Sequence, residues 1–226
     1  MQERLIIAID GPAASGKSTT ARLLARRLGY VYLDTGAMYR ACALRAKFGG
    51  VDLDDADAVS AMLQKLDIRV ETCGEQNVTL LDGKDVSEAI RANDISKLSS
   101  EISAVPAVRY RMVELQREMG AQGGVILDGR DIGTFVFPNA DIKFFLTAAP
   151  EIRARRRWLE LQKKGIAKDF AEVLKELEER DRNDAARALA PLAIADDAIV
   201  VDTGQISVDE QVDTLHGIIL ARLEGI

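Results

Sequence analysis

The stretch LIIAIDGPAASGKSTTARLLARRLG, residues 5–29, decides the fold of this chain. It opens with a short apolar run, residues 5–9, which is typical of a buried strand in a parallel sheet. From Lys17 onward apolar residues recur at helical spacing, and Gly29 supplies a C-terminal stop for the helix. The sequence therefore predicts a strand, a loop and a helix in direct succession.

The loop between that strand and that helix, residues 11–18, matches the pattern G-x4-G-K-[ST]. Glycines in such a loop let the backbone wrap so that its N–H groups face phosphate oxygens, and the following helix adds its positive end. Lys17 is expected to reach the β- and γ-phosphates of a nucleoside triphosphate, and Ser18 to ligate Mg²⁺. The residues assigned to nucleotide binding are Gly11, Pro12, Ala13, Ala14, Ser15, Gly16, Lys17, Ser18 and Thr19.

The rest of the chain repeats the alternation of strand and helix. We expect core strands at 31–33, 125–127, 142–146 and 198–201, and helices at 38–48, 94–119 and 208–223, with a break at Pro106. Five parallel-type strands separated by helices imply an α/β fold with a doubly wound, five-stranded parallel sheet.

The pattern changes between residues 66 and 86. Residues 68–70 and 78–80 alternate like half-buried antiparallel strands, separated by turn residues such as Gly74 and Asn77. This segment predicts a small antiparallel β insert in the α/β domain.

The composition limits the classes of function. A chain of 226 residues with 47% hydrophobic residues is long enough for one compact domain with a real core. Its formal net charge of -6 argues against broad electrostatic binding to nucleic acid, which needs a basic face. The two cysteines lack the spacing of a zinc site, and no apolar run is long enough to span a bilayer, so we expect a cytoplasmic protein without membrane contact.

Arginines stand out against this acidic background. Five of them are expected just after predicted strands or at helix ends, namely Arg40, Arg109, Arg130, Arg180 and Arg187. Four more form a dense cluster in the charged, helical stretch 151–187, namely Arg153, Arg155, Arg156 and Arg157. Guanidinium groups suit phosphate oxygens, so the pattern favours phosphoryl transfer to an acceptor that is itself phosphorylated. A GTPase is disfavoured because the sequence has no Asn/Thr-Lys-x-Asp segment to read guanine.

Four segments together resemble the bacterial cytidylate kinases. They are residues 11–18, LDTGAMYR at 33–40, DGRDIGT at 128–134 and ERD at 179–181, and the resemblance covers essentially the whole chain. It implies Mg²⁺-assisted transfer of a phosphoryl group from ATP to CMP or dCMP, in pyrimidine nucleotide metabolism, by a monomer. It also implies a single P-loop kinase domain with a core (about 1–50, 106–150 and 188–226), a monophosphate-binding insert (about 51–105) and an arginine-rich lid (about 151–187).

The resemblance also assigns residues to the acceptor nucleotide. Arg40, Arg130 and Arg187 would hold its phosphate, each as a potential bidentate clamp. Cytosine offers an exocyclic amine, which would donate a hydrogen bond to the Asp131 carboxylate. Uracil presents a carbonyl at that position, which the carboxylate would repel. The remaining acceptor residues by similarity are Arg109 and Ser100 for the base, Asp184 for the sugar, and Thr35 and Tyr39 for the pocket lining.

Catalysis in such kinases is positioning plus charge neutralisation, so no general base is expected. Lys17, Arg130, Arg156 and Arg180 are the candidates for contacts to the transferring phosphoryl group. Ser18 is a candidate Mg²⁺ ligand. Asp34 has two alternatives, orientation of Mg²⁺ through water or capping of the next helix.

Two other functions remain open from the residues alone. One is a P-loop kinase acting on a different monophosphate or on a sugar acid, and the other is a nucleotide-controlled binding protein without phosphoryl transfer. Turnover with a panel of acceptors distinguishes the three.

Overall fold

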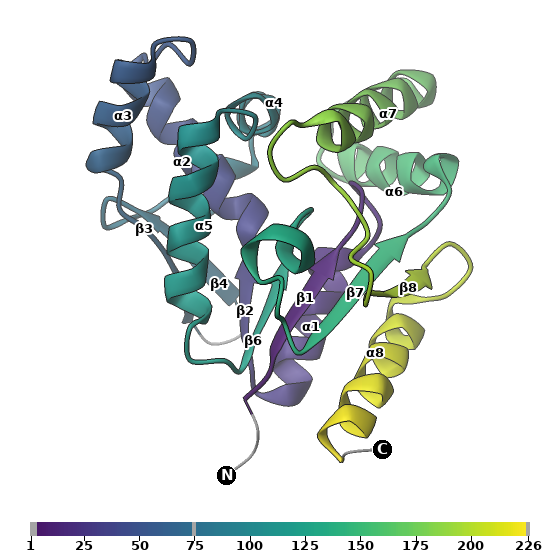
Figure 1. Cartoon of the computed structure of the whole chain (residues 1–226). Helices are drawn as coiled ribbons and strands as arrows, with labels where there is room; N and C mark the ends of the chain where they lie inside the picture. The colour runs from purple at the N-terminus through teal and green to yellow at the C-terminus, as the bar shows by residue number, and fades with distance from the viewer. Residues whose placement is uncertain (1–3, 74–75, 225–226) are drawn as a thin grey trace. The chain divides into compact units, whose positions relative to one another are not determined.

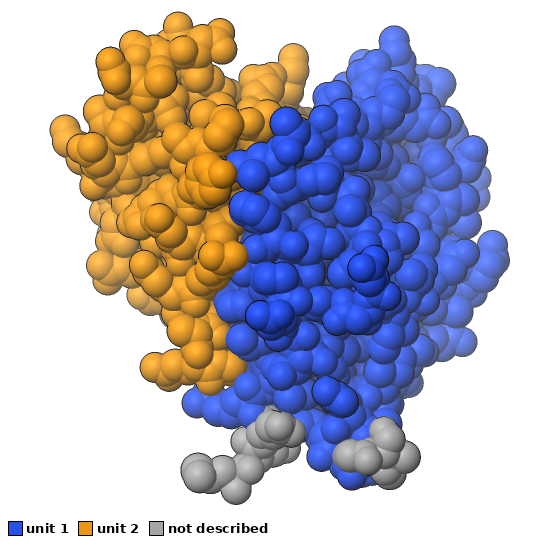
Figure 2. Space-filling view, in the orientation of Figure 1, with its two compact units in different colours: residues 1–30, 124–226 blue, residues 31–123 orange. Residues whose placement is uncertain are grey.

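The computed structural model describes residues 4–73 and 76–224. The chain divides into two compact units, one made of Met1–Tyr30 with Gly124–Ile226 and the other of Val31–Gly123 (Figure 2). The first unit holds the phosphate-binding loop, and the second holds the β insert.

The main sheet has five strands in the order β2-β6-β1-β7-β8. The central strand β1 pairs in parallel with β6 and with β7, so that Ile7 lies beside Ile126 and Ile142, and β7 pairs in parallel with β8. The five strands are β1 (Ile6–Asp10), β2 (Val31–Asp34), β6 (Val125–Asp128), β7 (Ile142–Thr147) and β8 (Ile199–Asp202). The predicted five-stranded parallel sheet is confirmed, and the carboxyl ends of β1, β6 and β7 meet at one edge, where ligands gather in such folds.

The longer helices described in the first unit form two pairs (Figure 1). α1 packs against α8 and also contacts β1 and β6, while α6 packs against α7. The helices are α1 (Lys17–Leu28), α6 (Pro150–Lys163), α7 (Phe170–Ala186) and α8 (Val208–Leu223). α1 begins and ends as the sequence predicts, because Gly29 adopts φ 67° and closes the helix.

The charged stretch 151–187 is helical as predicted, and it forms two helices, α6 and α7. Gly165, with φ 71°, lies in the connection between them. The Trp158 indole Nε1 donates a hydrogen bond of 2.9 Å to the carbonyl of Lys168, which ties α6 to that connection. Trp158 therefore stabilises the α6–α7 hairpin.

The second unit combines helices with a three-stranded sheet in the order β3-β4-β5. β3 pairs antiparallel with β4, and β4 with β5, which confirms the predicted β insert. Besides β2, its elements are α2 (Thr35–Gly49), α3 (Ala56–Gln64), β3 (Ile68–Cys73), β4 (Gln76–Leu81), β5 (Lys84–Asp85), a 3-10 turn (Ala89–Arg91), α4 (Asn93–Ile102) and α5 (Pro106–Gly120). Pro106 opens α5, so the predicted break in the helix is confirmed, because proline fits the first turn of a helix.

Two details of the sequence prediction were wrong in this unit. Asn77 does not lie in a turn; it pairs with Thr72 inside the β3–β4 ladder, and its side-chain amide donates a hydrogen bond of 2.5 Å to the carbonyl of Tyr32. Gly74, the other expected turn residue, lies outside the described residues. The helix expected at 38–48 starts earlier, at Thr35, because the Asp34 carboxylate caps it by accepting from the Ala37 amide at 2.8 Å.

Candidate active site

The phosphate-binding loop has the backbone shape that its glycines allow. Gly11 adopts φ 144°, and a Cβ placed there would lie 2.0 Å from the carbonyl oxygen of Leu146. Gly16 adopts φ 95° at the start of α1, a conformation that side chains disfavour. Both fixed glycines of the motif are thus required by the geometry of the loop.

Lys17 lies folded over this loop. Its Nζ donates to the carbonyl of Pro12 at 2.6 Å and to Oγ of Ser15 at 3.2 Å, and the residue is buried. Burial, together with the charge of Arg130, holds the pKa of Lys17 well below its usual value, against the opposing influence of Asp128. A bound anion beside Nζ would favour the charged ammonium, so the site is electrostatically suited to a phosphate.

Ser18, the candidate magnesium ligand, meets a carboxylate that the sequence prediction missed. Its Oγ donates a hydrogen bond of 2.6 Å to Oδ2 of Asp128, the last residue of β6. A hydroxyl and a carboxylate oxygen are hard ligands of the kind that Mg²⁺ takes from P-loop proteins. No group of three or more His, Cys, Asp or Glu residues that could hold a metal occurs among the described residues, and Mg²⁺ typically keeps several waters and substrate oxygens.

Two arginines that the sequence assigned to the acceptor come together around the buried carboxylate of Asp184, a third residue of that set. Asp184 accepts from Nε of Arg130 at 2.9 Å and from Nη2 of Arg187. Burial alone would raise the pKa of Asp184, but Arg130, Arg187 and Arg180 outweigh it and hold that pKa below its ordinary value. Arg130 and Arg187 bond to this carboxylate and Arg180 acts on it electrostatically, so guanidinium groups are concentrated here, as suits the binding of an anion.

Arg180 lies inside α7 and Arg40 inside α2, so the expectation that both stand at element ends was wrong. The early cap at Asp34 shifts the start of α2, and α7 runs on to Ala186. Their placement inside helices fixes their backbones more firmly than a loop would.

The other predicted catalytic arginine, Arg156, is held at the loop through Thr203. Nη1 of Arg156 donates to the Thr203 hydroxyl at 3.0 Å and Nη2 donates to its carbonyl at 2.5 Å. The same hydroxyl donates to the carbonyl of Ser15 at 2.9 Å. Thr203 therefore links a lid arginine to the phosphate-binding loop.

A second link joins α6 and α7 to the loop. Oδ1 of Asp181 accepts from the amide of Ala13 at 3.3 Å, while its Oδ2 accepts from Nη1 of Arg153. Arg153 also donates from Nη1 to the carbonyl of Ala13 at 3.3 Å and from Nε to that of Ala148 at 2.8 Å. A carboxylate thus holds one of the loop amides that the motif assigns to phosphate.

Asp131, the predicted base-reading residue, follows β6 and is buried. It precedes a π-helical turn, Ile132–Val136, and its carbonyl accepts from the amides of Phe135 and Val136 at 2.9 and 3.1 Å. The turn, which the sequence did not predict, fixes the backbone of this residue.

The second unit brings together its own predicted residues in two pairs. The guanidinium of Arg109, buried with 1% exposure, lies 5.7 Å from the ring centroid of Tyr39, in cation–π contact. Nη2 of Arg40 donates to Oδ2 of Asp34 at 3.1 Å. One Asp34 carboxylate oxygen caps α2, and the other accepts from Arg40. These contacts support the capping role of Asp34, whereas its role toward Mg²⁺ stays a prediction.

The last two predicted acceptor residues lie on α2 and α4. Thr35 is buried at the start of α2, and Ser100 lies in α4, where its carbonyl accepts from the hydroxyl of Ser103 at 2.8 Å. The carbonyl of Ser103 in turn accepts from Nη1 of Arg109 at 3.2 Å. Ser100 is therefore tied to Arg109 through Ser103.

The family assignment follows from comparison with known proteins. The family model described as "Cytidylate kinase" matches residues 7–220. The chain belongs to the cytidylate kinase family. A cytidylate kinase of Desulfitobacterium hafniense is 48% identical over 99% of this chain and 96% of its own length, and one of Syntrophotalea carbinolica is 49% identical over 98% and 94%.

A solved structure agrees on the fold. An uncharacterized protein from Eubacterium ventriosum matches with a TM-score of 0.53 at 12% identity, covering 96% of this chain and 99% of that one. At this identity the likeness shows a shared fold alone. None of the helices in the described part of the chain is both long and apolar enough to cross a membrane.

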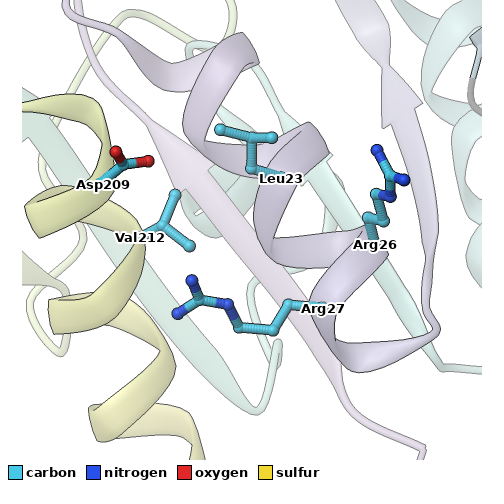
Figure 3. Close-up of a pocket in the computed structure, with 5 residues that line it drawn as sticks. All are labelled: Leu23, Arg26, Arg27, Asp209 and Val212. Carbon is cyan, nitrogen blue, oxygen red and sulfur yellow. The ribbon is translucent and has the colours of Figure 1, made fainter.

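A pocket of about 380 Å³ lies elsewhere on the first unit of this cytidylate kinase family member. It is lined by residues of α1 and α8, namely Leu23, Arg26, Arg27, Asp209 and Val212 (Figure 3). None of them belongs to the predicted site. Arg27 also forms an exposed ion pair with Asp213 at 2.5 Å. This exposed pair is a control for the stability contributed by the buried ion pairs of Asp184.

Proposed function

We propose that this protein transfers the γ-phosphoryl group of ATP to CMP or dCMP, forming CDP or dCDP and ADP. The observation that carries the proposal is the arginine cluster around Asp184 in a chain of the cytidylate kinase family. A reaction between two phosphorylated compounds must neutralise charge on both, and an excess of guanidinium groups supplies that charge.

In this reaction a phosphate oxygen of the acceptor attacks the γ-phosphorus of ATP, and the bond from that phosphorus to the β,γ-bridging oxygen breaks. The acceptor oxygen is already ionised at neutral pH, so no side chain has to remove a proton. The chain's task is to orient the two phosphates and balance their charge. Lys17 and the loop amides would take the donor phosphates, while Arg130 and Arg187 would take the acceptor phosphate.

Ser18 and Asp128 would hold Mg²⁺, whose bound charge would neutralise the phosphate oxygens of ATP. Arg156 and Arg180 would contact the transferring group. Thr203 holds the Arg156 guanidinium by two hydrogen bonds, which would support its role at the transferring group. The acceptor-binding roles of Thr35, Tyr39, Arg40, Ser100, Arg109 and Asp184, and the Mg²⁺ role of Asp34, stay predictions from the resemblance.

Selection of cytosine would rest on Asp131. An ionised carboxylate accepts from the exocyclic amine of cytosine and repels the carbonyl that uracil presents at the same position. The three-part division into core, insert and lid, the monomeric state, the cytoplasmic location and the lack of nucleic-acid or membrane partners are proposed with this function.

The test is release of ADP by the purified protein with Mg-ATP and, in turn, CMP, dCMP, UMP, AMP, GMP, dTMP and no acceptor. We expect turnover to be highest with CMP or dCMP. No acceptor-dependent turnover despite ATP binding would refute the kinase assignment and favour a nucleotide-controlled binding protein.

A variant tests the pocket separately. Asp131→Ala should lower the preference for CMP over UMP by at least about tenfold, because the buried hydrogen bond from the cytosine amine to the Asp131 carboxylate is lost. If the preference stays unchanged in an active Asp131→Ala protein, another residue reads the base.

A further inference from the structure

Asp10 is a buried carboxylate to which the proposed reaction gives no direct part. It is the last residue of β1, directly before Gly11, and it is 5% exposed. Its Oδ1 accepts a hydrogen bond of 2.9 Å from the amide of Ile132, and its Oδ2 accepts one of 2.7 Å from the amide of Gly133. These two amides open the turn that follows Asp131.

The two converging amides explain the residue type. A carboxylate offers an acceptor oxygen to each amide, whereas asparagine would turn an NH₂ group toward one of them. Burial raises the pKa of Asp10 to about 7, with Asp131 adding to the rise, while the two amide bonds and the charge of Lys17 oppose it. Burying the Asp10 carboxylate costs free energy, but only a carboxylate satisfies both amide donors at this position.

The turn is also confined from its other side. A Cβ at Gly133 would lie 3.0 Å from Cδ of Lys143 and 3.4 Å from Oδ2 of Asp10. Nζ of Lys143 donates to the carbonyl of Pro138 at 2.6 Å and to Oδ1 of Asp197 at 2.8 Å, so its stem has little freedom to move. Gly133 is therefore fixed between the Asp10 carboxylate and the Lys143 stem.

We propose that Asp10 is a positioning residue for the acceptor nucleotide. By holding the amides of Ile132 and Gly133, it sets the orientation of Arg130 and Asp131 relative to the phosphate-binding loop, which begins at the next residue. Asp10 thereby connects the end of β1, which continues into the phosphate-binding loop, to the turn that follows Arg130 and Asp131. The inference rests on the base-reading role proposed for Asp131.

The test is the steady-state kinetics of Asp10→Asn with CMP, UMP and ATP. A misplacement of about 1 Å can cost on the order of a hundredfold in rate, so we expect kcat/KM for CMP to fall by about ten- to a hundredfold. The preference for CMP over UMP should fall by at least about tenfold. KM for ATP is measured in parallel, because the charge of Asp10 also acts on Lys17 of the donor loop.

Asp141→Asn is the matched control. Asp141 is an exposed carboxylate that accepts from the amide of Ile6 at 2.7 Å, at the opposite end of β1. It shares the chemistry of Asp10 without touching the turn, so its kinetics should match those of the unchanged protein. An equal loss for CMP and UMP in Asp10→Asn, with the preference intact, would show that Asp10 is only structural.

Gly133→Ala keeps the idea testable should Asp10→Asn not fold. Its Cβ crowds Lys143 and displaces the same turn while Asp10 remains, so the preference for CMP should again fall, by a smaller factor. A folded Gly133→Ala protein with an unchanged preference would overturn the proposal.

The two levels of inference fail differently. If Asp131→Ala keeps the preference for CMP, the base-reading role falls and takes the positioning role with it. If Asp131→Ala loses the preference and Asp10→Asn keeps it, only the positioning role is wrong.

Discussion

Replacing Asp184 by asparagine should destabilise the protein markedly, because it removes the carboxylate that faces three arginines. The side chain of Asp184 is 1% exposed, and those of Arg130 and Arg187 are 19% and 10% exposed. Breaking a buried ion pair costs about 3–5 kcal/mol, and the partial exposure of Arg130 favours about 3 kcal/mol here. For a chain of this size that loss lowers Tm by roughly 6–12 °C.

The assay is thermal and urea-induced unfolding at low salt, with Asp213→Asn as the control. Asp213 pairs with Arg27, but these side chains are 66% and 41% exposed, so the control should lose less than about 1 kcal/mol. Added sulfate should stabilise Asp184→Asn more than the control, because the anion replaces the lost charge. A Tm for Asp184→Asn equal to that of the control would refute the view that this carboxylate balances the cluster.

Two further predictions concern carboxylates near the phosphate-binding loop. Asp128→Asn should raise the Mg²⁺ concentration for half-maximal turnover by about ten- to a hundredfold, because a charged oxygen beside Ser18 is lost; a Mg²⁺ titration with an unchanged midpoint would contradict it. The pKa of Asp10 is raised from 3.8 to about 7, so the stability it contributes is complete below pH 3.8 and is lost as pH rises through 7. Between pH 5 and 8 the free energy of unfolding should therefore fall by roughly 2–3 kcal/mol more in the wild-type protein than in Asp10→Asn. If the free energies of the two proteins, measured by urea unfolding, change in parallel with pH, the pKa of Asp10 is not raised.

The parts of the fold that sequence predicted are those encoded locally. The strand, glycine loop and helix of residues 5–29 follow from neighbouring residues, and the structure has them at nearly the predicted bounds. β5 was missed because two residues carry no periodicity, and α3 because its main signal is the Asp55 cap, which lies among several other aspartates.

The missed site residues share a different cause. Ser18 and Asp128 are 110 positions apart, and Ser15 and Thr203 are 188 apart, so no local pattern joins them. Asp128 could have been found from the sequence, because it directly follows the predicted strand 125–127 and is the first residue of the DGRDIGT segment. Asp181 likewise stands in the ERD segment, although its contact with the Ala13 amide is made only in the folded chain. Thr203 carried no comparable signal, because its contacts with Arg156 and Ser15 form only on folding.

The bond from Trp158 to the carbonyl of Lys168 gives the protein an optical property. Trp158 is the single tryptophan of the chain, and it lies on α6 against the connection to α7. Indole emission depends on solvent contact and on hydrogen bonding of the ring nitrogen. The ultraviolet fluorescence of the unlabelled protein is therefore a local signal from the α6–α7 hairpin, the same helices that hold Arg153, Arg156 and Asp181.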